Sequence, residues 1–89
     1  MLDLAVTNQM KKDLKLAKKR GKNLTKMSYV VELLRQGIIL SPKYKNHRLS
    51  GNYKDHWECH LEGDWLLIYL LDSKTLTLVR TGTHADLFE

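Results

Sequence analysis

The chain has few of the residues that mark disulfide-rich, secreted or membrane-spanning proteins. Its 89 residues include one cysteine, Cys59, and one proline, Pro42. A lone cysteine cannot form an internal disulfide, which fits a reducing compartment. No apolar run is long enough to cross a bilayer, and residues 1–16 lack the apolar core of a signal peptide. We therefore expect a cytoplasmic protein.

Length and apolar content predict one folded domain over residues 1–89. A chain of this size has little room for a second domain. Hydrophobic residues make up 43% of the sequence, which is ordinary for a folded protein and argues against disorder.

Basic residues outnumber acidic ones by 15 to 10, which gives a net charge of +5. One basic block lies within residues 11–26, and it fits nucleic acid, an acidic protein partner or simply a solvated helix face. The second block leads directly into a histidine-rich region. We therefore treat three cations of this second block as candidate RNA contacts: Lys45, Arg48 and Lys54.

Hydrophobic periodicity predicts a strand at 2–6 and then two helices. Thr7 is a plausible N-cap for the first helix, and Asn23 or Thr25 for the second. After an irregular basic segment, three β-prone runs follow at 57–61, 65–71 and 75–81, and residues 83–88 could form one helical turn. The predicted fold is α+β, with two N-terminal helices packed on a mainly antiparallel sheet of about four strands.

Alternation in the strand at 57–61 separates two kinds of side chain. Trp57 and Cys59 fall on one face, and Glu58 and His60 on the other. With the helices covering the apolar face, the opposite face is free to carry a polar site.

Four potential proton carriers lie in the C-terminal half: His47, His60, Asp64 and His84. Histidine titrates near neutral pH and can give or take a proton there. We expect the turn at 62–64 to bring Asp64 close to His60, where a carboxylate would orient the imidazole. Turn capping by Asp64 and solvated positions for the histidines are the ordinary alternatives. With the basic surface, the set favours a ribonuclease.

We expect no metal site. His56 and His60 have metal-ligand spacing for a helix, but they lie in a strand pattern, and no HExxH or CxxC motif is present.

Three other side chains have two interpretations each. Trp65 is either core or a platform for a base, and Phe88 is either an anchor for the tail or such a platform. Arg80 indicates a buried ion pair or a phosphate contact.

Three runs resemble the YafQ-type toxins of the RelE/ParE superfamily, the mRNA-cleaving halves of bacterial toxin–antitoxin pairs. The runs are YKNHRLSG, HWECHLEGDWLLIYLL and LVRTGTHADLF, and they occur in the order that the family shows. The resemblance covers the layout of the whole chain, but diagnostic residues cover only about half of it.

This resemblance implies a function and a set of site residues. His47, His60, Asp64 and His84 would form the catalytic set, and Arg80 would face the scissile phosphate. Trp65 and Phe88 would shape the site or contact RNA. The implied reaction is ribosome-dependent cleavage of mRNA in the decoding site, without metal or cofactor, by attack of the RNA's own 2′-hydroxyl. The implied partners are a DinJ/RelB-like antitoxin, mRNA and the ribosome, with operator DNA bound only through the antitoxin.

The sequence departs from the family pattern at two positions. Relatives often carry arginine at the position of Trp57 and proline at that of Gly63. Other functions also remain open, namely a non-catalytic RNA- or ribosome-binding module and a ParE-like toxin that poisons DNA gyrase. The histidine set argues against the gyrase toxin, which has no need of proton carriers.

Overall fold

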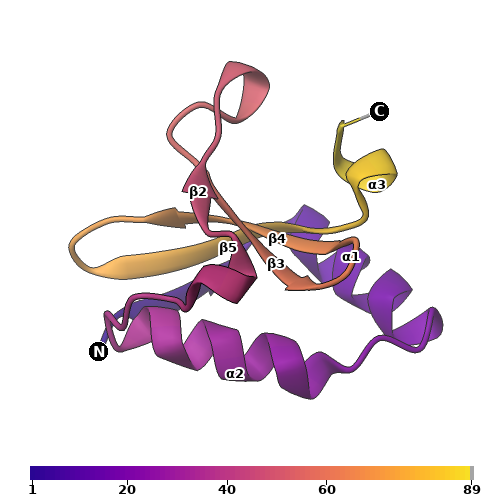
Figure 1. Cartoon of the computed structure of the whole chain (residues 1–89), viewed down its shortest axis with the longest axis horizontal. Helices are drawn as coiled ribbons and strands as arrows, with labels where there is room; N and C mark the ends of the chain where they lie inside the picture. The colour runs from indigo at the N-terminus through magenta and orange to yellow at the C-terminus, as the bar shows by residue number, and fades with distance from the viewer. Residues whose placement is uncertain (89) are drawn as a thin grey trace.

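The computed structural model describes residues 1–88 (Figure 1). In chain order its elements are β1 (Asp3–Val6), α1 (Asn8–Lys19), α2 (Leu24–Arg35), the 3₁₀ turn η1 (Pro42–Tyr44), β2 (His47–Arg48), the 3₁₀ turn η2 (Gly51–Tyr53), β3 (Trp57–Glu62), β4 (Trp65–Leu71), β5 (Thr75–Gly82) and α3 (His84–Phe88). Within residues 1–88, no helix has the length and apolarity needed to cross a membrane.

Both long helices begin at side-chain caps. The Thr7 hydroxyl accepts a hydrogen bond from the Met10 amide at 3.0 Å, and the Asn23 side chain accepts one from the Thr25 amide at 3.0 Å. Such caps satisfy amides that the first helical turn leaves without partners. The cap predicted at Thr7 is confirmed, and Asn23 rather than Thr25 caps the second helix.

The strands form one five-stranded sheet in the order β1-β5-β4-β3-β2. β1 runs parallel to β5, and the other pairs are antiparallel. The predicted α+β class is confirmed, with five strands in place of about four. The additional strand is β2, which lies in the segment predicted as irregular and pairs His47 with Glu58.

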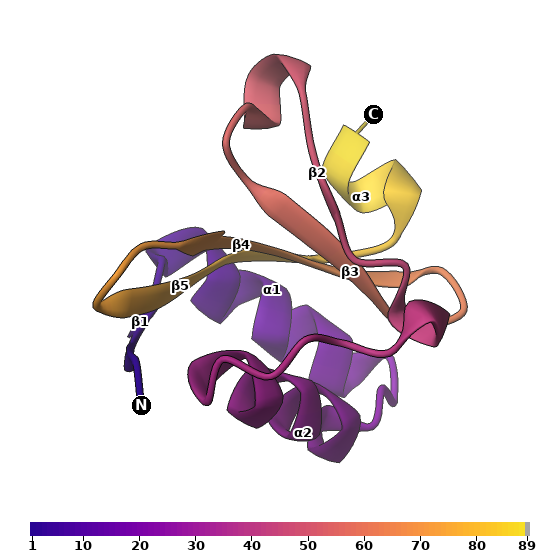
Figure 2. The ribbon, with the colours of Figure 1, turned by 60° about the vertical axis from the view of Figure 1, so that its left-hand side comes forward.

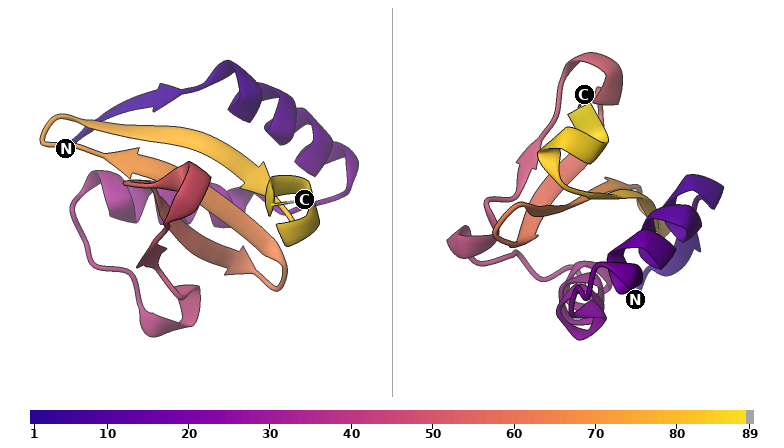
Figure 3. Two further views of the ribbon diagram at one scale, coloured as in Figure 1. Left: turned by 90° about the horizontal axis from the view of Figure 1, so that it is seen from above. Right: turned by 90° about the vertical axis from the view of Figure 1, so that its right-hand side faces the viewer.

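The two faces of the sheet have different coverings. α1 and α2 lie on one face, whereas α3 and the β2–η2 segment lie on the other (Figures 2 and 3). The main core fills the helix side and includes Trp65 and Tyr69, while a smaller cluster of Leu66, Ile68 and Leu87 lies beneath α3. The face opposite the long helices is therefore only partly covered, and it holds the polar residues described next.

Candidate active site

Three histidines from separate elements meet on this second face. His47 comes from β2, His60 from β3 and His84 from the start of α3. The ring centroids of His47 and His60 are 6.4 Å apart, and those of His60 and His84 are 5.8 Å apart. The structure thus brings together the three histidines that the sequence analysis singled out. We call them the histidine cluster.

Glu58 lies beneath the histidine cluster, and the sequence analysis gave it no role. Its Oε1 is 3.5 Å from Nε2 of His47 and 3.7 Å from Nε2 of His60. The side chain is only 3% exposed, and its Oε2 has no hydrogen-bond partner among residues 1–88. The Glu58 carboxylate thus lies where it can orient both imidazole rings. Strand alternation had placed Glu58 on the correct face, and its pairing with His47 across β2 and β3 completes the arrangement.

Asp64 contacts His84 rather than His60, so the predicted pairing of Asp64 with His60 is wrong. Its Oδ1 accepts hydrogen bonds from the ring Nδ1 of His84 at 2.5 Å and from the His84 amide at 3.0 Å. These bonds from the amide and the ring lower the pKa of Asp64. The register of β3 and β4 shifts between His60 and Glu62, and the following turn directs Asp64 toward α3.

The β3–β4 turn differs from the one expected in relatives with proline. Gly63 has a φ of 48°, in the left-handed region. Proline fixes φ near −65° and cannot adopt this conformation. The turn that presents Asp64 therefore depends on glycine in this chain.

Two of the imidazoles have a defined tautomer. Nδ1 of His47 lies 2.7 Å from the Lys45 carbonyl oxygen, and Nδ1 of His84 contacts the Asp64 carboxylate. Both partners can only accept, so each Nδ1 must donate. Nε2 of His84 is then left for a ligand, whereas Nε2 of His47 lies 3.5 Å from Oε1 of Glu58.

The position of His84 also depends on the anchoring of α3. Thr83 and Asp86 cap each other: the Thr83 amide donates to the Asp86 carboxylate at 2.9 Å, and the Asp86 amide donates to the Thr83 hydroxyl at 3.1 Å. Arg20, just after α1, donates to both carboxylate oxygens of Asp86 at 2.6 and 3.3 Å. The Arg20 guanidinium and the Thr83 amide lower the pKa of Asp86 to about 2. Gly82 permits this approach, because a Cβ there would lie 2.8 Å from the Asp86 carboxylate.

Arg80 forms a largely buried ion pair. Its Nε and Nη2 donate to the two carboxylate oxygens of Asp13, each at 3.0 Å, and the Thr81 amide adds a bond to Asp13 at 3.2 Å. The bonds to Asp13 raise the pKa of Arg80, with a smaller contribution from Tyr53. Of the two interpretations from sequence, the ion pair is present. The Arg80 side chain keeps 24% of its surface exposed, and its contact with a phosphate stays a prediction.

The two candidate stacking residues differ in exposure. Trp65 is 1% exposed and packs in the main core, which agrees with the core interpretation and leaves its ring no free face for a base. Phe88 is 45% exposed. Its ring lies 5.7 Å from that of Tyr53 and 6.1 Å from that of His84, measured between centroids. Phe88 therefore borders the histidine cluster with a free surface.

The three candidate cations occupy different places. Lys45 is exposed and precedes His47 closely, with a left-handed φ of 47°. Arg48 contacts Asp55 at 3.4 Å and lies over the ring of Trp57. Trp57 packs against the helix-side core, so neither side chain faces the histidine cluster. Lys54 is exposed at the end of η2.

Three residues have the geometry to hold a metal ion. Glu58, His60 and His84 each offer a ligand atom, and these atoms lie within 4.8 Å of one another. Imidazole and carboxylate ligands suit zinc and copper. No such group was expected from the sequence, and its ligands come from two elements far apart in the chain, β3 and α3. His56 is elsewhere, with its Nδ1 3.0 Å from the Lys54 carbonyl oxygen.

Known proteins match this chain over nearly its full length. The family model described as "Bacterial toxin of type II toxin-antitoxin system, YafQ" matches residues 2–89. The mRNA interferase toxin YafQ of Escherichia coli K12 is 45% identical over 87 residues, covering 97% of this chain and 95% of the relative.

Solved structures agree with this match. The toxin in the E. coli DinJ–YafQ toxin–antitoxin complex is 44% identical with a TM-score of 0.91, covering 99% of this chain and 98% of that one. A metal-bound toxin from Helicobacter pylori is 43% identical with a TM-score of 0.92, covering 99% and 100%. Sequence and fold together place this chain in the YafQ family of bacterial toxins of type II toxin–antitoxin systems.

Proposed function

We propose that this chain is an mRNA interferase, an endoribonuclease that cleaves mRNA by attack of the RNA's own 2′-hydroxyl. The observation that carries the proposal is the histidine cluster, with Glu58 beneath it and Asp64 bonded to His84. General acid–base catalysis requires positioned groups of this kind. The name of the E. coli relative, an mRNA interferase, agrees with it.

In the proposed reaction, His60 is the base. It takes the proton of the 2′-hydroxyl, and the freed oxygen attacks the adjacent phosphorus. Glu58, 3.7 Å from Nε2 of His60, stabilises the imidazolium that forms. His47, whose Nδ1 is bound to the backbone, offers Nε2 toward the same region. It supports the base and the negative charge on the phosphate.

His84 is the proposed acid. Its Nδ1 stays bonded to Asp64, so the proton on Nε2 of the imidazolium is the one available to the leaving 5′-oxygen. The bond between phosphorus and the 5′-oxygen breaks as that oxygen accepts the proton. The products are a 2′,3′-cyclic phosphate and a 5′-hydroxyl end. In this assignment the carboxylate that supports the base is Glu58, and Asp64 supports the acid.

Dependence on the ribosome follows from how open the site is. The side chains of His47 and His84 are 48% and 57% exposed. Such a surface does little to hold a flexible RNA with its 2′-hydroxyl in line, and that alignment is a large part of the rate. We propose that the ribosome supplies it. By analogy with the E. coli complex, we propose a DinJ/RelB-like antitoxin as the protein partner.

The test is a translation reaction programmed with a defined mRNA. The His84→Ala variant should cut about 10²–10⁴-fold more slowly than the wild type. The matched control is His56→Ala, because His56 lies outside the histidine cluster. Primer extension with and without ribosomes locates the cuts, and a 2′-deoxy substitution at the cut site should block cleavage.

Several results would overturn the proposal. Undiminished cleavage by His84→Ala would remove the assigned acid. RNA binding that survives this change with no cut ends from the wild type would indicate a non-catalytic binding module. Intact mRNA together with DNA damage in cells would indicate a gyrase poison.

A further inference from the structure

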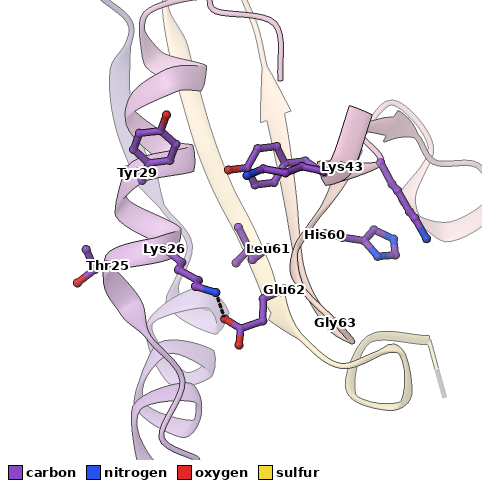
Figure 4. A pocket seen from close by; sticks show the side chains of 10 residues that line it. Thr25, Lys26, Tyr29, Lys43, His60, Leu61, Glu62 and Gly63 are labelled. Atoms are coloured by element: carbon purple, nitrogen blue, oxygen red, sulfur yellow. Dashed lines mark ion pairs between the residues drawn. The ribbon is translucent and has the colours of Figure 1, made fainter. Parts of the chain in front are cut away.

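A groove runs beside the histidine cluster, between α2 and the end of β3. It has a volume of about 660 Å³, within the range of small-molecule sites in proteins. Tyr29 and Lys26 line it from α2, and Lys43 and His60 lie on the other side (Figure 4). Leu61 also lines it. The groove and the histidine cluster thus share one residue, His60.

The side of the groove formed by η1 is positively charged. Two other lining residues, Lys26 and Glu62, form an ion pair at 2.9 Å, and Lys26 lowers the pKa of Glu62. That pair contributes no net charge. Lys43 and Lys45 also line the groove, and neither has a carboxylate partner within 4.0 Å among residues 1–88. Two ammonium groups without a carboxylate partner among these residues favour an anionic occupant.

Aromatic rings line both sides of the groove. Tyr29 is 60% exposed although it belongs to a helix that packs on the core. Tyr44 lies opposite in η1, with Nζ of Lys43 5.1 Å from its ring centroid. Tyr44 is partly buried against the main core, so Tyr29 is the more exposed of the two rings. Aromatic rings beside lysines are elements that bind single-stranded nucleic acid, because bases stack on the rings and lysines neutralise phosphates.

We infer that this groove is a binding subsite for a single-stranded RNA nucleotide next to the cleaved linkage. This inference rests on the proposed function. A scissile phosphate at His60 leaves the adjoining nucleotide at the mouth of the groove. The base stacks on Tyr29 with Tyr44 opposite, and the phosphate contacts Lys43 and Lys45. An acidic segment of a protein partner would meet the same charges. RNA is favoured because His60 belongs to both places.

The first experiment tests stacking with an uncleavable probe, a fluorescein-labelled 2′-O-methyl RNA hexanucleotide. Fluorescence anisotropy at low salt gives its affinity for the purified toxin. Tyr29→Ala should weaken binding about 5- to 100-fold, in keeping with the loss of one stacked base. Tyr29→Phe keeps the ring and should remain within about twofold of the wild type. Equal binding by all three proteins would overturn the inference.

The second experiment tests the phosphate contacts. The slope of log affinity against log salt should fall by about 0.7 for each of Lys43→Gln and Lys45→Gln, as expected for single strands. Lys74→Gln is the control, because Lys74 is exposed in the β4–β5 turn, at the other end of these strands from His84. Slopes that change equally at all three lysines would indicate diffuse charge and not a subsite.

Cleavage on programmed ribosomes completes the test. Tyr29→Ala should raise the substrate concentration for half-maximal cleavage, while Tyr29→Phe leaves it unchanged. If Tyr29→Ala cleaves normally but loses antitoxin binding, the groove belongs to the protein partner and the inference is wrong. If the wild type cuts no mRNA at all, the proposed function fails. The hexanucleotide experiment then still shows, independently of cleavage, whether the groove binds single-stranded RNA.

Discussion

The ion pair between Asp13 and Arg80 should contribute strongly to stability, and Asp13→Asn measures that contribution. Asp13 is 6% exposed and accepts bonds from Gln9, twice from Arg80, and from the Thr81 amide. Asparagine has nearly the same shape but carries no charge. It also places an NH₂ group where donors already converge, so at least one donor loses its acceptor.

The size of the effect follows from burial. Removing the charge of one partner in a buried pair costs about 3–5 kcal/mol. Arg80 keeps 24% of its side chain exposed, so water can partly solvate its guanidinium. We therefore expect the low end, about 3 kcal/mol. For a domain of this size that lowers the melting temperature by about 12–24 °C.

The matched control is Asp55→Asn, the same chemical change in a surface pair. Asp55 contacts Arg48 at 3.4 Å, with side chains 71% and 57% exposed. Exposed pairs contribute about 0–1 kcal/mol, and asparagine tolerates the φ of 69° at this position. Urea unfolding at neutral pH measures both variants. If they lose equal stability, the buried pair contributes little and the reasoning is refuted.

The pH dependence of stability provides a second readout for Asp13. Burial alone would raise its pKa, but bonds from Arg80, Gln9 and the Thr81 amide outweigh burial and lower it. A carboxyl with a lowered pKa adds stability above its unfolded pKa and loses it as the pH falls through the folded pKa. The stability gap between wild type and Asp13→Asn should therefore narrow in acid. A gap that stays constant from neutral pH to the acid limit would contradict this assignment.

Three further predictions concern the active site and its support. Glu58→Gln should slow cleavage on the order of 10²-fold, because His60 loses the carboxylate that orients it; an unchanged rate would show that the carboxylate is dispensable. The pKa of Asp86, about 2 beside Arg20, predicts stability that is full above about pH 4 and falls toward pH 2, and Asp86→Asn should remove this part of the acid transition in circular dichroism. Zinc should inhibit cleavage by occupying Glu58, His60 and His84, and calorimetry in which His84→Ala binds zinc as tightly as the wild type would place the ion elsewhere.

Sequence predicted those parts of the fold whose causes are local. The Thr7 cap, the helix periodicity and the strand alternation each depend on residues within a few positions of one another. β2 was missed because only two residues, His47 and Arg48, pair with β3. A strand that short has no periodicity, and its existence depends on the edge that another segment presents.

The site was predictable as a set of residues but not as a set of contacts. Motif resemblance named three histidines, and the structure brings all three together. Asp64 was assigned to the wrong partner because the left-handed φ of Gly63 and the register shift in β3 determine its direction. Asp13 and Arg80 are 67 residues apart, and no short-range pattern relates them. Contacts of this kind follow from tertiary packing alone.

The acid and base sides of the proposed site depend on different parts of the molecule. His60 and Glu58 belong to β3, so the base side is positioned within the sheet. His84 is the first residue of α3. Within α3, the Asp86 carboxylate accepts hydrogen bonds from the Thr83 amide and from Arg20, which follows α1. His84 keeps its bonds to Asp64 only if the first turn of α3 is held in place. The basic segment of α1 and its C-cap is therefore more than a solvated surface, because Arg20 helps to determine where the proposed acid presents its proton.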